Sequence, residues 1–377
     1  MEVTLREVSR SKELGLFIRF PDKLYKGCEY YIPALHSTQL ETLSWLKNPA
    51  FDHCEARYWL AFKGSEIVGR IAGIINHRYN KDRNLSFMRI GWLDFVEDQQ
   101  VLETLLGAVE GWAKEKGLEF IHGPLGFNSF DASGVLIEGF AEWPTSFGKY
   151  NFPYYDPLLQ KAGFKKDVDW VEYNIKVPSE LNSRLSAAAL LVKKRYSVRN
   201  AELKSKSEVK KYAIQVFDLL NDVYGQLYGF SKLSPLQIDR LIRGFLLLIN
   251  PGFVSIVLNE SDEVVAFGLV MPSLGKALKK ANGKLWPFGI FCILWSLRFN
   301  HTVDMLLIGV RPDYQGRGVH ALIFEKIFNT FKKRGIKQVE TTRELEGNQK
   351  VQQLWVGYEP RLHKRSRCYV KQVGPSS

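Results

Sequence analysis

Hydrophobic and polar residues along the chain follow two patterns, short runs typical of strands and longer stretches with a helical period. In the first half they predict a strand pair around a Gly-Ser turn, a strand, a helix ending on a glycine, a strand, a helix and a strand. These elements are expected at 56–76, 87–96, 98–117, 118–125, 154–164 and 169–177. The same order returns in the second half at 253–271, 303–310, 319–335, 336–342, 348–358 and 366–373.

Strands and helices that alternate in this way predict an α/β chain with mixed layers of sheet and helix in both halves. A chain of 377 residues is also too long for one ordinary hydrophobic core, so two domains are expected. The stretch 178–195, with its Pro, Ser and basic residues, has the composition of a crossing between domains. We therefore expect one domain at 1–180 and another at 190–377, each with a central twisted mixed sheet flanked by helices.

Two segments interrupt the repeated order. The first, 123–157, is a long loop rich in Gly and aromatic residues, which either covers a substrate pocket or packs between the domains. The second, 285–299, is an apolar run too short to span a bilayer, and it predicts a buried helix. Alternatively, this run lines a pocket for a long acyl chain or anchors the protein to a membrane surface beside the basic stretch 276–284.

Composition narrows the class of protein. A hydrophobic content of 45% supports folded cores, and the four cysteines lie far apart without metal-ligand spacing. We expect reduced thiols, no metal site, no secretory signal and a cytoplasmic protein. The net charge of +12 suits an anionic ligand or a membrane surface, although a merely basic surface is the alternative. Because the basic residues are scattered, specific nucleic-acid binding is not expected.

The stretch "GVRPDYQGRGVH" (309–320) carries the chemistry. It joins a predicted strand to a predicted helix through a loop with two glycines. The first turn of a helix has unpaired N–H groups and a partial positive charge, and glycines let a ligand approach the backbone closely. Arg317 can add a charge-assisted contact. The sequence therefore predicts a phosphate site, the alternative being a chance Gly-rich turn.

The spacing of these residues differs from that of nucleotide-binding P-loops and of the dinucleotide fingerprint. It resembles the Gln/Arg-x-x-Gly-x-Gly/Ala loop of the GCN5-related N-acetyltransferase (GNAT) superfamily, in which loop amides hold the pyrophosphate of coenzyme A. The resemblance implies that coenzyme A is held by residues at the strand end, in the loop and on a later helix. These are Val310, Arg311, Gln315, Gly316, Arg317, Gly318, Val319, His320 and Asn348.

Two positions depart from the resemblance. His320 stands where the superfamily has Gly or Ala, and Trp355 stands where a tyrosine serves as general acid to the departing thiolate. Tyr358, one helical turn later, is the nearest substitute for that acid, or else a tyrosine of the core. These departures favour an alternative function, a catalytically inactive sensor or scaffold that binds coenzyme A or another anion.

Acyl transfer to an amine also needs a base, because an ammonium group is not a nucleophile. Asp304, on the strand before the loop, and Glu340, on the next strand, are the candidates; the alternative for Asp304 is a solvent-facing strand residue. By resemblance, the early helices of the second half contact the acceptor in this fold. Tyr224 and Tyr228 are candidates there, or else members of the core.

The whole chain is similar to a poorly characterised group of bacterial tandem GNAT-like proteins, on stretches such as "IVGRIAGIINHRYN" and "GFNSFDASGVLIEGF". The first half lacks the loop and has Glu97 and Asp98 in its place, which predicts a degenerate copy that binds no cofactor. The resemblance implies an N-acyltransferase that uses acetyl-CoA or another acyl-CoA. Its acceptor would be a small-molecule or peptide amine held between the halves, and weak association with a membrane surface remains open.

Overall fold

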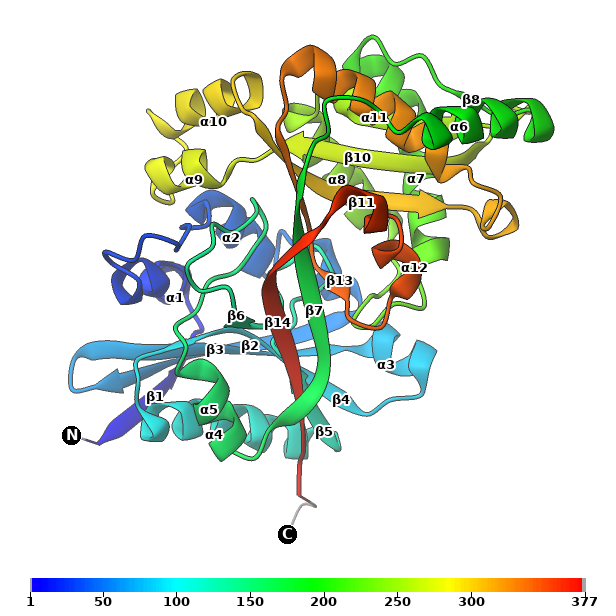
Figure 1. Cartoon of the computed structure of the whole chain (residues 1–377). Coiled ribbons are helices and arrows are strands. Elements are labelled where there is room, and N and C mark those ends of the chain that lie inside the picture. Colours follow the sequence, from blue (N-terminus) through cyan, green and yellow to red (C-terminus); the bar gives the residue numbers. More distant parts are fainter. Residues whose placement is uncertain (1, 375–377) are drawn as a thin grey trace.

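A computed structural model describes residues 2–374 and shows one continuous mixed sheet with helices on its faces (Figure 1). The strands are β1 Val3–Glu7, β2 Cys54–Lys63, β3 Glu66–Asn76, β4 Phe87–Phe95, β5 Phe120–Gly123, β6 Val135–Glu138, β7 Lys165–Lys176, β8 Arg199–Asn200, β9 Val254–Leu258, β10 Val264–Pro272, β11 Thr302–Val310, β12 Gln338–Thr341, β13 Glu344–Leu345 and β14 Arg361–Gln372. The mixed α/β class expected from the sequence is confirmed.

Along the chain, most α-helices connect one strand to a later one. They are α1 Ser11–Leu24, α2 His36–Leu43, α3 His77–Arg83, α4 Gln99–Glu115, α5 Tyr155–Lys161, α6 Ser183–Tyr196, α7 Lys206–Tyr224, α8 Pro235–Leu248, α9 Gly275–Ala281, α10 Gly289–Arg298, α11 His320–Arg334 and α12 Gln349–Gln352. Short 3-10 turns lie at Pro49–Asp52, Pro251–Phe253, Pro312–Tyr314 and Val356–Tyr358.

The expected helix at 348–358 is wrong in length. Only Gln349–Gln352 is α-helical, and a separate 3-10 turn covers Val356–Tyr358. The side chain of Trp355 turns inward and is buried, and Gly357 favours no helix. The chain therefore leaves the helical path before Trp355.

The order of strands shows an exchange between the two halves. The sheet runs β1-β2-β3-β4-β5-β14-β7-β12-β11-β10-β9-β8, with β4 parallel to β5 and β11 parallel to β12. Strand β7, from the first half, lies against β12 of the second, and β14, the last strand, lies against β5 of the first. Figure 1 shows β7 and β14 side by side at the centre of the molecule, where they form an antiparallel pair. Each half of the sheet is thus completed by a strand of the other half.

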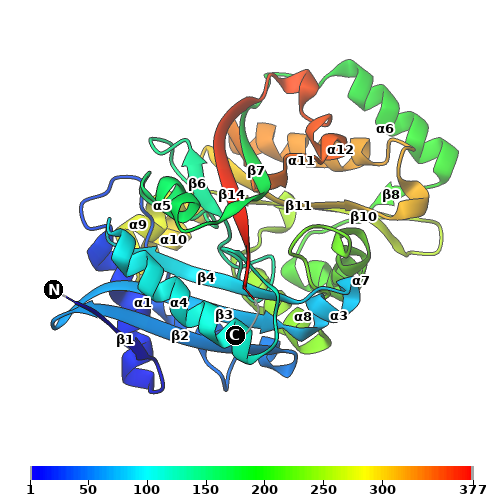
Figure 2. The same ribbon diagram turned by 90° about the horizontal axis from the view of Figure 1, so that it is seen from below.

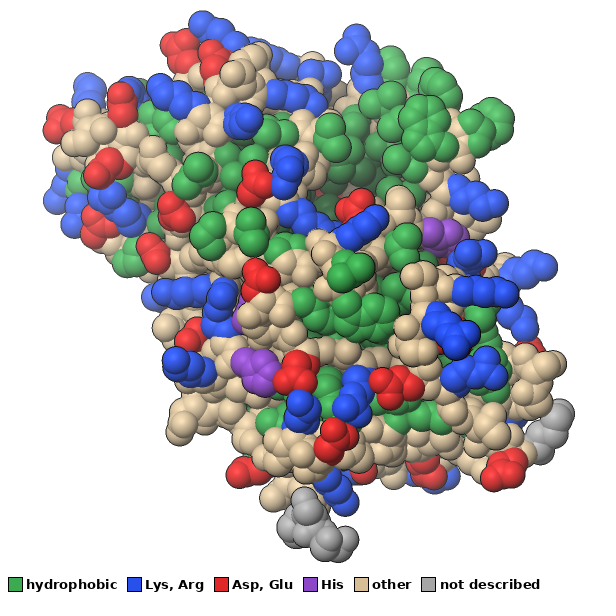
Figure 3. Space-filling model, turned by 180° about the vertical axis from the view of Figure 1, so that it is seen from behind, with side chains coloured by type: hydrophobic (Ala, Val, Ile, Leu, Met, Phe, Trp, Pro, Cys, Tyr) green, Lys and Arg blue, Asp and Glu red, His purple; other side chains and the backbone are tan. Residues whose placement is uncertain are grey.

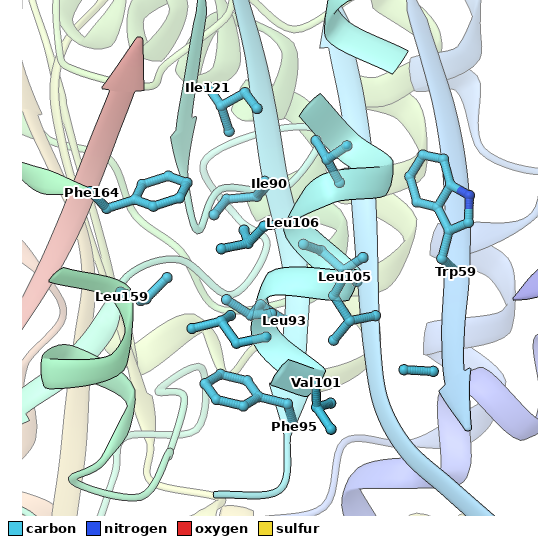
Figure 4. Packing of buried hydrophobic residues seen from close by; sticks show 14 of the residues in the cluster. Trp59, Ile90, Leu93, Phe95, Val101, Leu105, Leu106, Ile121, Leu159 and Phe164 are labelled. Carbon is cyan, nitrogen blue, oxygen red and sulfur yellow. The ribbon is translucent and has the colours of Figure 1, made fainter. Parts of the chain in front are cut away.

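Helices cover both faces of the first half of the sheet. Alternating residues of β2 and β3 pack on opposite sides, Trp59 and Ile71 against α4 and Tyr58 and Ala72 against α1. Figure 4 shows the side of α4, where Val101, Leu105 and Leu106 fill the space over the strands, and Figure 2 shows α4 lying across them. The core of this half also includes Tyr369 of β14 and Val373, which follows that strand.

Two arginines of the first half, Arg89 and Arg83, bind backbone carbonyl groups of the second half. Arg89 donates to the carbonyl oxygen of Gly229 at 3.0 Å, and Arg83 donates to those of Gly225 and Leu227. Burial lowers the pKa of Arg89, which is fully enclosed. A buried guanidinium left without these acceptors would be costly, so the two halves are held in one arrangement around the end of α7.

Candidate functional site

The loop between β11 and α11 leaves a row of backbone amides open. Gly316 and Gly318 have φ of +72° and +75°, which only residues such as glycine adopt without strain. The amides of Gly316, Gly318, Val319 and His320 donate to no acceptor in the described part of the chain. A Cβ on Gly316 would meet no atom within 4 Å, so the space beside this residue is open. These groups, with the helix dipole behind them, fit a phosphate group.

The arginines of the loop differ in their partners. Arg311 is held by Asp313 at 2.8 Å and by Glu263 at 3.1 Å, so its charge is already paired. Arg317 lies over the rings of Tyr196 and Tyr314, 5.2 and 5.5 Å from the centroids, with no carboxylate partner among the described residues. Arg317 is therefore the arginine available to an incoming anion.

Other predicted residues of the loop have structural contacts. The side chain of Gln315 donates to the carbonyl oxygen of Val310 at 3.1 Å and closes the loop. The ring of His320 packs against Phe324, and burial lowers the pKa of His320, which favours the neutral imidazole. Val319 is buried in the core of the second half. The side chains of this stretch therefore hold the loop in place, and its backbone faces the open space.

Beyond the loop, the neighbouring strands separate. Strand β11 pairs with β10 along its length, but with β12 only from Thr302 to Met305. From Leu306 onward the edge of β11 away from β10 has no strand beside it among the described residues. The hydroxyl of Tyr224 donates to the carbonyl oxygen of Ile308 at 2.9 Å on this edge.

A cavity of about 230 Å³ opens where the strands separate. Residues of both halves line it. From the first half come Leu125, Asn128, Ser129, Phe130, Ser133, Phe147 and Trp170, and from the second come Leu220, Tyr224, Leu227, Tyr228, Gly229, Phe230, Phe245, Met305, Leu306, Leu307, Ile308, Thr342, Arg343, Glu344, Leu345, Asn348, Val351 and Trp355. Most of these side chains are apolar, so the cavity suits a ligand with an apolar part.

Glu344 is the carboxyl group in the wall of this cavity. Its Oε1 accepts a hydrogen bond from the indole of Trp355 at 2.9 Å, and its Oε2 is buried without a partner in the described structure. Burial raises the pKa of Glu344 to about 7. A carboxyl group that changes its charge near neutral pH can accept a proton from a bound amine. The sequence prediction missed Glu344, because β13 is only two residues long and gives no periodic signal.

The two carboxylates predicted from the sequence lie next to each other but outside the cavity lining. Asp304 and Glu340 are paired in the parallel register of β11 and β12. Asp304 is buried and accepts from the backbone and hydroxyl of Ser146, and burial raises its pKa. Burial also raises the pKa of Glu340 to about 7, with Asp304 and Glu172 adding to the shift. Their role as bases stays a prediction.

The segment 123–157 lines the cavity and also packs between the two halves, and the acceptor in that cavity stays a prediction. Phe130, Ser133 and Phe147 line the cavity. Ser146 reaches across to Asp304 in the other half, so this segment also packs at the junction. Arg343, from the second half, donates in return to the carbonyl oxygen of Ser133. The wall of the cavity is therefore built by both halves and fixed by hydrogen bonds.

Tyr224, Tyr228 and Asn348 all line the cavity. The hydroxyl of Tyr228 donates to Asp167 at 2.5 Å and lies 3.2 Å from His122 Nδ1, so it is held in the strand-exchange region. Burial raises the pKa of Tyr224 to about 12, which keeps it a neutral donor. Contact of these residues with a ligand stays a prediction.

Comparison with known proteins agrees with this architecture. No known protein-family profile matches the chain. Among curated proteins, it is 29% identical over 385 aligned positions to Protein YghO of Escherichia coli (strain K12), covering 98% of this chain and 95% of that protein. It is 24% identical over 322 positions to Bacterial ceramide synthase of Caulobacter vibrioides, covering 83% and 82%.

Solved structures match over the full length. A tandem GNAT protein from the clavulanic acid biosynthesis pathway superposes with a TM-score of 0.58 at 12% identity, covering 100% of both chains. A GCN5-related N-acetyltransferase from Sphaerobacter thermophilus gives 0.53 at 11% identity, covering 100% of this chain and 97% of that one. The chain has the tandem GNAT fold.

The first GNAT-like half closes the place where the second is open. Helix α4 begins after Asp98, whose carboxylate accepts from the amides of Gln100 and Val101 at 2.8 and 3.2 Å. Its hydrogen bond with Lys63 lowers the pKa of Asp98, and the backbone amides add to this effect. The protein's own anion thus occupies the helix start, as the sequence indicated.

The position at which the resemblance predicts a general acid is occupied by Trp355. Trp355 is buried and holds Glu344 from the cavity side. Tyr358 lies in the 3-10 turn beyond it and lines a separate, smaller hollow with Phe324 and Phe328. Tyr358 is not among the residues that line the larger cavity, and its role as acid stays a prediction.

The helix expected at 285–299 is present in part as α10, but the expectation that it is buried is wrong. Trp286, Phe288, Phe291, Trp295 and Phe299 are more than half exposed. The helix buries only one face, against α9 and the end of β10, because α9 and α10 lie beyond the ends of β10 and β11. Among residues 2–374, no helix is long and apolar enough to cross a membrane, and no cluster of three or more His, Cys, Asp or Glu could hold a metal ion.

Proposed function

We propose that this chain is an acyl-CoA-dependent N-acyltransferase. The observation that carries the proposal is the succession of features along β11: a cavity beside its open edge, and a row of unpaired amides at its end. The amides of Gly316, Gly318, Val319 and His320, with Arg317, would hold the pyrophosphate of coenzyme A. We also propose that the two GNAT units correspond to 1–180 and 190–377, with exchanged last strands.

The open edge of β11 supports the placement of the donor. Backbone groups of β11 beyond Met305 would pair with the amide groups of an extended chain, as a neighbouring strand would, once the Tyr224 hydroxyl releases the N–H and carbonyl groups of Ile308 that it now contacts. Such a chain, anchored by its phosphates at the loop, leads back toward the cavity. The thioester supplies an activated acyl group, and the cavity would receive it.

Glu344 would serve as the base. The carboxylate takes a proton from the ammonium group of the acceptor, and the neutral nitrogen can then form its bond to the acyl carbon while the carbon–sulfur bond breaks. As this bond breaks, the nitrogen gives its second proton to the departing sulfur, so the products are an amide, a protonated Glu344 and a free thiol. Trp355 orients Glu344 through its indole N–H, and burial gives the carboxylate a pKa suited to this task near neutral pH.

The acceptor that fits best is an amine with a long apolar chain. The cavity wall is formed largely by Leu, Ile, Phe and Trp side chains, which offer little to a polar amine. The relative named Bacterial ceramide synthase points the same way, because a ceramide is a fatty amide of a long-chain amino alcohol. For the same reason, a fatty acyl-CoA is a better candidate for the donor than acetyl-CoA.

The test combines binding and turnover on the full chain. Calorimetry with coenzyme A, acetyl-CoA and a palmitoyl-CoA should show binding, tightest for the long acyl group. Mass spectrometry should then detect the N-acyl product of a long-chain amino alcohol, and little product from a short polar amine or a peptide. Binding without turnover on any of these amines would favour the inactive sensor. No binding of any coenzyme A derivative would contradict the proposal altogether.

A further inference from the structure

The projection formed by α9 and α10 exposes an unusual number of large apolar side chains. Those of the turn and helix that are more than half exposed are Trp286, Phe288, Phe291, Leu294, Trp295 and Phe299. Figure 3 shows hydrophobic side chains gathered over this projection at the upper right of the molecule, with Lys and Arg side chains beside them. Exposed apolar residues in one continuous patch mark a contact surface, whereas scattered ones do not.

The exposed face is part of an ordered structure. On α10, Gly289 and Ile293 face inward at helical spacing, and Ile293 packs with Leu274 and Ala277 of the α9 segment. The hydroxyl of Ser296 donates to the carbonyl oxygen of Ser273 at 2.9 Å, which ties α10 to the end of β10. Phe291, Leu294 and Trp295 stand on the other face, where a helix exposed only to water would carry polar residues.

The charges that this segment itself carries are of one sign. From Val264 to Val303 the sequence contains no Asp or Glu. Lys276, Lys280, Lys284 and Arg298 are all exposed, whereas Lys279 is used to bind the carbonyl oxygens of Cys28 and Glu29. Trp and Phe side chains with Lys and Arg beside them match the interface of a bilayer that carries anionic lipids.

The face is also connected to the cavity. Leu306 packs in the apolar cluster of α9 and α10, and the same side chain lines the cavity. Leu248, at the end of α8, belongs to that cluster too, and Phe245 of the same helix lines the cavity. A membrane or partner that binds α10 would therefore lie beside the elements that form the cavity.

We propose that the α9–α10 projection docks the protein on the surface of an anionic lipid bilayer. The aromatic side chains of α10 enter the headgroup region, and Lys280, Lys284 and Arg298 contact lipid phosphates. Docking itself does not depend on the acyl transfer. Its consequence does rest on the proposed function: a long-chain amine would reach the cavity from the bilayer rather than from water.

Flotation of the full chain with vesicles tests the docking. Wild-type protein should float with mixed phosphatidylcholine and phosphatidylglycerol vesicles, and less with phosphatidylcholine alone, with a loss of binding at high salt. The double variant Phe291→Ser/Trp295→Ser should bind at least about tenfold more weakly, because two large apolar side chains no longer enter the interface. The variant Lys280→Glu/Lys284→Glu should lose affinity for the anionic vesicles, and its weaker binding to phosphatidylcholine vesicles should stay the same.

The control is Leu190→Ser/Leu191→Ser on α6, which removes two apolar side chains exposed by 58% and 68% elsewhere. This variant should float like wild type, and thermal melting should show that all variants are folded. Absence of wild-type binding at low salt, or equal flotation of wild type and Phe291→Ser/Trp295→Ser, would overturn the proposal. Sedimentation that shows a dimer abolished by the same double variant, without flotation, would overturn it in favour of a protein interface.

The activity arm separates the two proposals. With a short, water-dissolved amine acceptor, the Phe291→Ser/Trp295→Ser variant should turn over like wild type, and with a long-chain amine in vesicles its apparent KM should rise. Flotation without any turnover would leave docking in place and remove the proposed function. Turnover without flotation would leave the proposed function in place and remove the docking proposal.

Discussion

The starts of α4 and α11 occupy corresponding places in the two halves, but one is closed and the other is open. At α4, the carboxylate of Asp98 accepts from two backbone amides and pairs with Lys63. At α11, two glycines with positive φ lead into the helix, and the amides around them have no acceptor in the described chain. In the same fold, the amides at one helix start bind a carboxylate of the protein itself, and those at the other are free to bind an anionic ligand. The lesson is that the ligand site depends on a few loop residues rather than on the fold.

The largest effect on activity should come from the residue after β12, where the two halves also differ. Glu344 follows β12 at the same interval at which Gly126 follows β5, so only the second half has a carboxyl group at this position. Glu344→Gln should lower kcat about 1,000-fold, because the amide cannot take the proton. In wild type, activity should rise with pH through about 7, since the carboxylate acts only when unprotonated and burial raises its pKa to about 7.

The control for this prediction is Glu340→Gln, at a carboxyl group whose pKa is also raised to about 7 but which does not line the cavity. It should leave kcat and the rise with pH nearly unchanged. The reverse result, a loss of the pH-dependent rise in Glu340→Gln only, would identify Glu340 as the base in place of Glu344.

The next effect should follow from closing the open helix start. Gly318→Asp places a carboxylate at the loop, as Asp98 does in the first half, and should weaken acyl-CoA binding about 100-fold through repulsion between like charges. Gly318→Asn is the matched control, because Asn has the same size and tolerates positive φ similarly. Calorimetry should show a much smaller loss for Asn. Equal losses would mean that backbone strain, and not charge, explains the effect.

A smaller effect should come from Arg317, the loop arginine without a carboxylate partner in the described structure. Arg317→Ala should weaken acyl-CoA binding about tenfold by removing one charge-assisted contact, and the affinity should then depend less on salt. Arg311→Ala, at an arginine already paired with Asp313 and Glu263, should change affinity less. Titrations at several salt concentrations measure both, and the opposite ranking would show that Arg311 leaves its partners to hold the ligand.

The smallest effect should come from opening the closed helix start. Asp98→Ala should lower the free energy of unfolding by about 1 kcal/mol, because two amides at the start of α4 lose their cap. Asp98→Asn keeps a capping side chain and should lose less. Denaturant unfolding measures the difference, and acyl-CoA affinity should be unchanged in both variants. New binding of a second equivalent of acyl-CoA by Asp98→Ala would show that the first half is not degenerate.

The sequence predicted the order of strands and helices and the place of the loop, because these depend on local periodicity and on glycines. The exchange of β7 and β14 could not be predicted, since both halves offer similar last strands and only three-dimensional packing selects the partner. The cavity and Glu344 were missed for a related reason. They arise where β11 and β12 separate and the segment 123–157 of the other half closes the wall.

The exposure of α10 was also beyond the sequence. A continuous apolar run predicts a buried helix, but here α10 lies beyond the ends of β10 and β11, where Phe291 and Trp295 are exposed. By contrast, the closed start of α4 could be predicted, because an Asp directly before a helical period is a capping signal.

A crystal structure of the full chain with coenzyme A tests the central claim most directly. The account predicts the pyrophosphate oxygens within hydrogen-bond distance of the amides of Gly316 and Gly318, the remainder of the molecule along the open edge of β11, and no coenzyme A at α4. A pyrophosphate bound elsewhere, with the amides at the start of α11 turned away from it, would contradict the account.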